Sequence, residues 1–197
     1  GIPGPYQTVI YFPGSGVMQM SSSDDLDAHA RILADVIVRS RRAFVYPIYK
    51  GMQGRRIENF TLSSMTDLTR QRDWQIQCRK DLGRTIDYLE TRAEIDTRKL
   101  AFPGSSLGGS PGVTLLGVED RFAVAVIEAG GLPPRWRPLP EADLLNFLPR
   151  VQIPVLMLSG RYEVAHAYCT RVVEQLERID VESNVMLGYM RRGYIYL

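Results

Sequence analysis

The sequence predicts an α/β protein, in which a mostly parallel β-sheet is flanked by helices. Three observations support this fold class. Short apolar runs typical of strands alternate with longer amphipathic stretches typical of helices. The runs 122–127 and 155–158 contain no polar residue, as expected for strands that are buried on both faces. Three glycine-rich turns each follow such a run, so they are expected to meet at the carboxyl edge of the sheet.

The predicted elements follow one another along the chain in alternation. The strands are expected at 8–12, 43–46, 99–102, 122–127 and 155–158, with 184–187 as a candidate last strand. The helices are expected at 27–38, 67–90, 109–116 and 165–176. In the longest helix, Trp74, Cys78, Leu82, Ile86 and Leu89 recur at spacings of four and three, which predicts one apolar stripe packed against the core.

Length and composition predict one soluble domain over residues 1–197, with hydrophobic residues at 45% and charged residues at 23%. A net charge of +2 is too small to indicate nucleic acid or an anionic membrane as a partner. No stretch is long and apolar enough to span a membrane, and the first residues do not resemble a signal peptide. Cys78 and Cys169 have no metal-type spacing and are too few for a disulfide scaffold, which favours a cytoplasmic location and predicts no metal or cofactor.

The motif that indicates a catalytic residue is G-x-S-x-G at 104–108, directly after a predicted strand. It is the pattern of a nucleophile elbow, a tight turn that lifts a serine above a parallel sheet. Close packing of the chain at positions −2 and +2 favours glycine, which selects Ser106 over Ser105, whose corresponding neighbours are Pro103 and Leu107. Two prolines are unfavourable for such an elbow. Pro103 removes a backbone hydrogen-bond donor at the end of the strand, and Pro111 falls early in the next helix.

The same glycines are compatible with two other interpretations. The first is a glycine-rich turn that only joins a strand to a helix. The second is a phosphate-binding loop, but neither G-x-G-x-x-G nor G-x-x-x-x-G-K is present, so nucleotide binding is disfavoured.

Beyond this motif, most of the chain from Tyr6 to Glu163 resembles the α/β-hydrolases of the serine esterase and peptidase type. More narrowly, it resembles the hydrolase domain that is found at the C-terminal end of some bacterial serine/threonine protein kinases and also occurs as free-standing esterases. The stretches that carry it are 6–15 (YQTVIYFPGS), 46–51 (YPIYKG), 80–92 (KDLGRTIDYLETR) and 146–163, which begins NFLPRV and ends LSGRYE.

The resemblance implies a role for each matching residue. Ser106 corresponds to the nucleophile. The backbone N–H of Leu107, with one from the Gly14–Ser15–Gly16 loop, corresponds to the oxyanion hole. Glu163 stands at the position of the triad acid, where the family usually has Asp.

The histidine is the main departure from the family. Where the family has Gly-His, this chain has Gly193-Tyr194, and a tyrosine is a poor base at neutral pH. His166, three residues after Glu163, is the candidate base, although it could instead begin a helix and face solvent. His29 is expected to be a surface residue of the first helix.

The resemblance also implies that two opening strands and a final helix of the family are lacking. The strand at 8–12 would then be a sheet edge with unpaired backbone groups, which predicts association with a second copy.

The sequence therefore predicts a serine hydrolase that cleaves carboxylic esters through an acyl-enzyme. The stretch between 127 and 155 is short and rich in proline, so no large lid is expected, and an open site would favour short acyl esters. The alternative is a non-catalytic hydrolase-like domain that binds a partner or a small ligand, and the missing histidine supports it.

Overall fold

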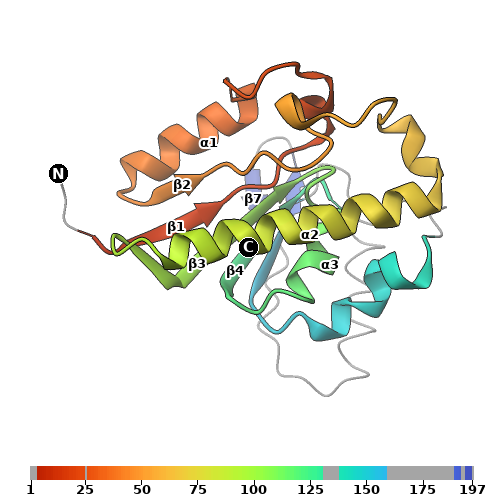
Figure 1. Ribbon diagram of the computed structural model, residues 1–197. Coiled ribbons are helices and arrows are strands. Elements are labelled where there is room, and N and C mark those ends of the chain that lie inside the picture. The colour runs from red at the N-terminus through yellow and green to blue at the C-terminus, as the bar shows by residue number, and fades with distance from the viewer. Residues whose placement is uncertain (1–3, 25, 131–137, 159–188, 192–193, 197) are drawn as a thin grey trace.

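The computed structural model describes residues 4–24, 26–130, 138–158, 189–191 and 194–196. Its centre is a five-stranded parallel sheet in the order β2-β1-β3-β4-β5 (Figure 1). The strands are β1 Tyr6–Ile10, β2 Ala43–Val45, β3 Ile95–Ser105, β4 Phe122–Glu128 and β5 Val155–Leu158. A separate antiparallel pair consists of β6 Tyr189–Arg191 and β7 Tyr194–Tyr196. The α/β class and all five predicted strands of the sheet are confirmed.

Three α-helices accompany the sheet in the described part of the chain: α1 Ala28–Arg39, α2 Leu68–Glu90 and α3 Gly112–Leu116. Short 3-10 turns lie at Ser15–Gln19, Gln53–Arg55, Ser63–Thr66, Pro140–Ala142, Leu144–Asn146 and Leu148–Arg150. The helix predicted at 165–176 and the strand predicted at 184–187 lie outside the described residues.

Side chains at the helix starts explain where these helices begin. The Asp27 carboxylate accepts a hydrogen bond from the Ala30 amide, and Asp67 accepts from two amides of the first turn of α2. The third helix begins later than predicted, at Gly112 rather than 109. Pro111 is its N-cap, where no backbone donor is needed, so this proline costs the helix no hydrogen bond.

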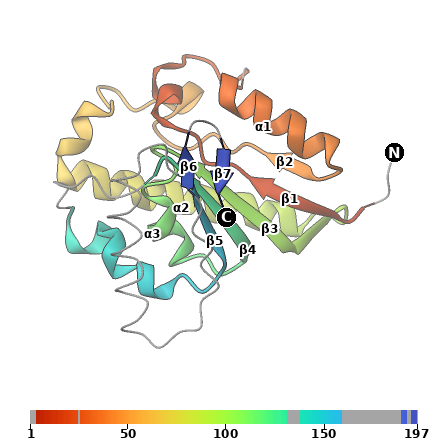
Figure 2. The same cartoon turned by 180° about the vertical axis from the view of Figure 1, so that it is seen from behind.

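The core lies between the sheet and α2, which crosses in front of the sheet in Figure 1 and behind it in Figure 2. All five residues of the predicted stripe are buried: Trp74, Cys78, Leu82, Ile86 and Leu89. Phe12, just beyond β1, stacks on Tyr49 with ring centroids 4.0 Å apart and meets Trp74 edge-on. This aromatic packing fixes the loop after β1 against α2.

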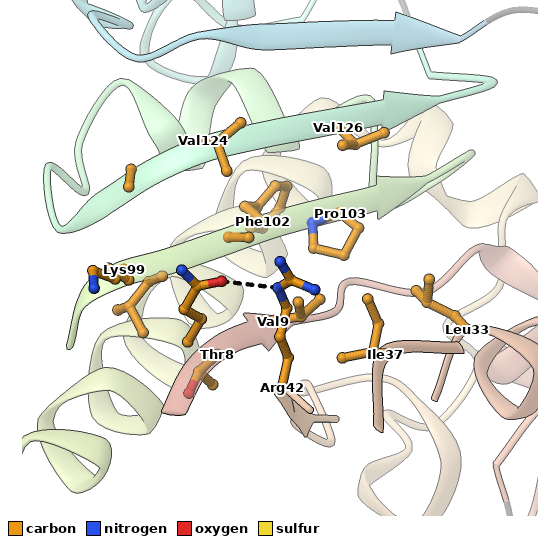
Figure 3. Close-up of a pocket in the computed structure, with 14 residues that line it drawn as sticks. Thr8, Val9, Leu33, Ile37, Arg42, Lys99, Phe102, Pro103, Val124 and Val126 are labelled. Atoms are coloured by element: carbon orange, nitrogen blue, oxygen red, sulfur yellow. Dashed lines mark hydrogen bonds between the residues drawn. The ribbon is translucent and has the colours of Figure 1, made fainter. Parts of the chain in front are cut away.

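The opposite face of the sheet is only partly covered by described residues. Beside α1 runs an apolar groove of about 510 Å³, whose lining includes Leu33, Pro103, Val124 and Val126 (Figure 3). Val124 is 39% exposed there. The expectation that strand 122–127 is buried on both faces is therefore wrong for this face, because α1 extends over the neighbouring strands and not over β4.

The edge of the sheet also differs from the expectation. The first strand is not an edge, because β1 pairs with β2 on one side and with β3 on the other. Among the described strands, β2 is the one with no neighbour on its outer side at this end of the sheet. Self-association through a sheet edge stays a proposal, and it would involve β2 rather than β1.

A buried carboxylate joins the start of β4 to the helices. Glu119, whose side chain is 2% exposed, accepts two hydrogen bonds of 2.7 Å from Arg121 and lies 3.2 Å from the guanidinium of Arg79. We expect Glu119→Ala to lower the free energy of unfolding by about 3 kcal/mol, because it leaves two arginines without their buried partner. Urea denaturation would measure this. Asp35→Ala, which removes an exposed pair with Arg39, should change little.

Candidate active site

Ser106 lies at the carboxyl end of β3 in a conformation that side chains rarely adopt. Its φ is +49° and its side chain is exposed, whereas Ser105 before it is half-buried. The turn is held by backbone hydrogen bonds: the Ser106 N–H donates to the Glu128 carbonyl at 2.7 Å, and the Gly109 N–H donates to the Ser106 carbonyl at 3.0 Å. A strained, well-anchored serine at the end of a central parallel strand has the geometry of a nucleophile elbow.

The two flanking glycines are required by close backbone contacts. A Cβ on Gly108 would lie 2.2 Å from the carbonyl oxygen of Phe12, and one on Gly104 would lie 2.7 Å from the carbonyl oxygen of Gly108. Both distances are shorter than any ordinary contact, and the atoms met are backbone atoms that cannot turn aside. The steric argument made from the sequence for positions −2 and +2 therefore agrees with the structure.

Backbone amides next to Ser106 could stabilise an oxyanion. The N–H groups of Gly108, Gly109 and Ser110 are used within the turn, but no described residue accepts a hydrogen bond from the Leu107 N–H. The loop after β1 lies over the elbow, since a Cβ on Gly14 would be 3.5 Å from Cβ of Ser106. A 3-10 turn begins at Ser15, and the first amides of such a turn have no partner within it.

A histidine and a carboxylate meet beside the elbow. His29 Nε2 lies 3.1 Å from the Glu128 carboxylate, with the two side chains 46% and 40% exposed. The imidazole also stacks on the ring of Tyr11, with an interplanar angle of 8° and centroids 5.9 Å apart. His29 is exposed, as the sequence predicts for a surface residue, but it occupies the same edge of the sheet as the serine turn.

Two phenols, of the buried Tyr11 and the half-buried Tyr46, lie beside this cluster. The Tyr46 hydroxyl donates to Asp27 at 2.9 Å, and the Tyr11 hydroxyl is hydrogen-bonded to the side chain of Ser105. Burial, and secondarily the nearby Asp27 carboxylate, raises the pKa of Tyr11 well above its usual range. Burial and the hydrogen bond to Asp27 likewise raise the pKa of Tyr46. Both groups are therefore neutral hydrogen-bond donors at physiological pH and not proton acceptors.

Sequence reasoning did not find the pair of His29 and Glu128. The two residues are 99 positions apart in the chain, and only the parallel pairing of β3 with β4 brings the second beside the elbow. One weak signal was available: Glu128 is the first charged residue after an apolar strand that ends at the carboxyl edge.

The predicted acid and base belong to a part of the chain that the structure does not describe. Glu163 and His166 lie outside the described residues, as does the third glycine-rich turn beyond β5. Tyr194 is the first residue of β7. The described structure thus brings together Ser106, Leu107 and the loop with Gly14 and Ser15, and leaves the predicted acid and base as predictions.

Neither a scan of known family models nor a search of the curated proteins finds a match. Solved structures do match. A protein from Klebsiella pneumoniae assigned as a dienelactone hydrolase superposes with a TM-score of 0.67 at 16% identity, over 95% of this chain and 75% of that one. A dienelactone hydrolase-like promiscuous phosphotriesterase from metagenomic libraries gives 0.65 at 19% identity, over 98% and 72%. The acylaminoacyl peptidase of Pyrococcus horikoshii gives 0.67 at 13% identity, over 96% and 33%.

These similarities establish the architecture: the chain has the α/β-hydrolase fold. At such low sequence identity, the similarity shows the fold and does not indicate a reaction or a substrate for this chain. The resemblance to domains attached to protein kinases stays a prediction. Within the described residues, no helix has the length and apolar character needed to cross a membrane.

Proposed function

We propose that the protein is a serine hydrolase that cleaves carboxylic esters through an acyl-enzyme at Ser106. The observation that carries the proposal is the exposed Ser106 at φ +49°, followed directly by the Leu107 amide, which donates to no described residue. That arrangement suits attack on an acyl carbon, because a neighbouring amide can bind the oxygen on which negative charge develops. Structural neighbours that are described as esterases and peptidases also support acyl transfer.

In the proposed reaction, Ser106 Oγ forms a bond to the acyl carbon and its proton passes to a base. The carbonyl oxygen becomes an oxyanion near the Leu107 amide and the loop amides of Gly14 and Ser15. Collapse of this intermediate expels the alcohol and leaves an ester on Ser106, which water then hydrolyses. Short acyl groups are the proposed substrates, because the described chain places no large lid over Ser106.

A chromogenic short-chain ester such as 4-nitrophenyl acetate tests the proposal. We expect Ser106→Ala to reduce the enzyme-dependent rate by about 10³-fold or more, because the nucleophile is removed while the fold is kept. Equal rates for the two proteins would overturn the proposal. That result would favour the second candidate, a non-catalytic binding domain, which is supported by the tyrosine that stands where the family has its histidine.

A further inference from the structure

The elbow needs a base, and the described structure offers one imidazole at the right edge of the sheet. His29 is linked to Ser106 by two contacts in series: its Nε2 lies 3.1 Å from the Glu128 carboxylate, and the Glu128 carbonyl accepts the Ser106 N–H at 2.7 Å. Glu128 is therefore the single residue that connects His29 to the main chain of Ser106. His29 itself comes from α1, which is far from Ser106 in the sequence.

The direction of approach follows from strand pairing. Ser105 is paired with Glu128 in register between β3 and β4, so their side chains project to the same side of the sheet. The helix α1 lies on this side, and His29 is in its first turn. His29 thus reaches the elbow from the α1 side, opposite to the core packed under α2.

Two aromatic and acidic neighbours lie beside the His29 ring. The Tyr11 ring is nearly parallel to it, with centroids 5.9 Å apart, and Asp27, the N-cap of α1 two residues before His29, accepts a hydrogen bond from Tyr46. Among the described residues, the charged and titratable groups around the ring are Glu128 from β4, Tyr11 after β1, Asp27 before α1 and, behind them, Tyr46. When Nε2 carries the proton donated to Glu128, Nδ1 keeps a lone pair and can accept a proton. An acid, an oriented imidazole and a serine are the parts of a catalytic triad.

We infer that His29 is the general base of Ser106 and that Glu128 positions it, an inference that rests on the proposed hydrolase function. In acylation, the Ser106 hydroxyl proton moves to Nδ1 of His29 while Oγ bonds to the acyl carbon. The same proton then passes from Nδ1 to the departing alkoxide, and Glu128 stays ionised throughout. Water repeats the two transfers in deacylation. The contact between Nδ1 and Ser106 forms with bound substrate, since such hydrogen bonds often tighten only in the complex.

The test compares variants of the two histidines in ester hydrolysis. We expect His29→Gln to lower kcat/KM by about 10²-fold or more, because the amide can still donate to Glu128 but cannot accept the proton. His29→Ala should show a similar loss and recover activity when imidazole is added. Glu128→Gln should lower kcat with little change in KM. His166→Gln tests the other candidate base that the sequence offers, and the inference requires that it lose far less activity than His29→Gln.

The results separate this inference from the proposed function. Activity that depends on Ser106 but survives His29→Gln, or that is lost in His166→Gln, would overturn the role of His29 and leave the hydrolase intact. Loss of activity in His29→Ala without rescue by imidazole, together with full activity in His29→Gln, would make His29 a structural residue only. Circular dichroism of each variant verifies that it is folded.

Discussion

A fluorophosphonate probe is expected to label this protein at Ser106, and Ser106→Ala should abolish the labelling. The probe reacts with serines whose hydroxyl is activated and accessible. Ser106 is exposed at the tip of the elbow, and the Leu107 amide, which donates to no described residue, is the expected donor to the phosphoryl oxygen. Peptide mapping by mass spectrometry would locate the adduct, and the yield would tell whether every molecule has an activated nucleophile.

Ser105→Ala is the matched control for this experiment, because it removes the neighbouring hydroxyl from the same turn. That hydroxyl is half-buried and hydrogen-bonded to Tyr11, so we expect the variant to keep its labelling. An adduct on Ser105 would refute the assignment of the nucleophile. Absence of any adduct on the wild type, while a known serine hydrolase is labelled in parallel, would favour the binding-domain alternative.

Gly108→Ala is expected to be the most damaging single-methyl substitution near the site. The added Cβ would lie 2.2 Å from the Phe12 carbonyl oxygen and 2.7 Å from the carbonyl carbon of the same residue. The Phe12 carbonyl accepts the Ser105 N–H at 3.0 Å, so moving it displaces the elbow. We expect the free energy of unfolding to fall by about 3 kcal/mol, the upper end of overpacking costs, together with loss of esterase activity.

Gly16→Ala provides the comparison, because it adds the same methyl group to the loop after β1. A Cβ at Gly16 meets no atom of the described residues within 4 Å. Thermal denaturation and ester hydrolysis should both be close to those of the wild type. If Gly108→Ala behaved like Gly16→Ala, the close approach between the loop after β1 and the elbow would be wrong.

Structural features that depend on residues close together in the sequence are predicted well from it. The stripe from Trp74 to Leu89 is buried because a helix places residues three and four apart on one face. The glycines at 104 and 108 were predicted because a turn of this kind brings the chain against itself at a fixed spacing. The start of α3 was placed too early, because the sequence pattern could not tell the turn at 106–111 from a helix.

Contacts between segments that are far apart in the sequence could not be predicted in the same way. The apolar run of β4 gives no sign that Val124 faces an open groove, since that depends on how far α1 extends over the sheet. The family resemblance, with its two opening strands lacking, predicts that the first strand is an edge. Its pairing with β2 spans a helix and a turn, and no local pattern records that pairing.

The sequence by itself determined the fold class, the elbow and the choice of Ser106 over Ser105, because all three follow from local spacing and the size of neighbouring side chains. The tertiary structure alone decided what surrounds that serine. It placed the Gly14 loop over the elbow and set His29 against Glu128 beside it. The physical reason is that parallel pairing gathers strand ends that are far apart in the chain, and no local pattern records which residues meet there.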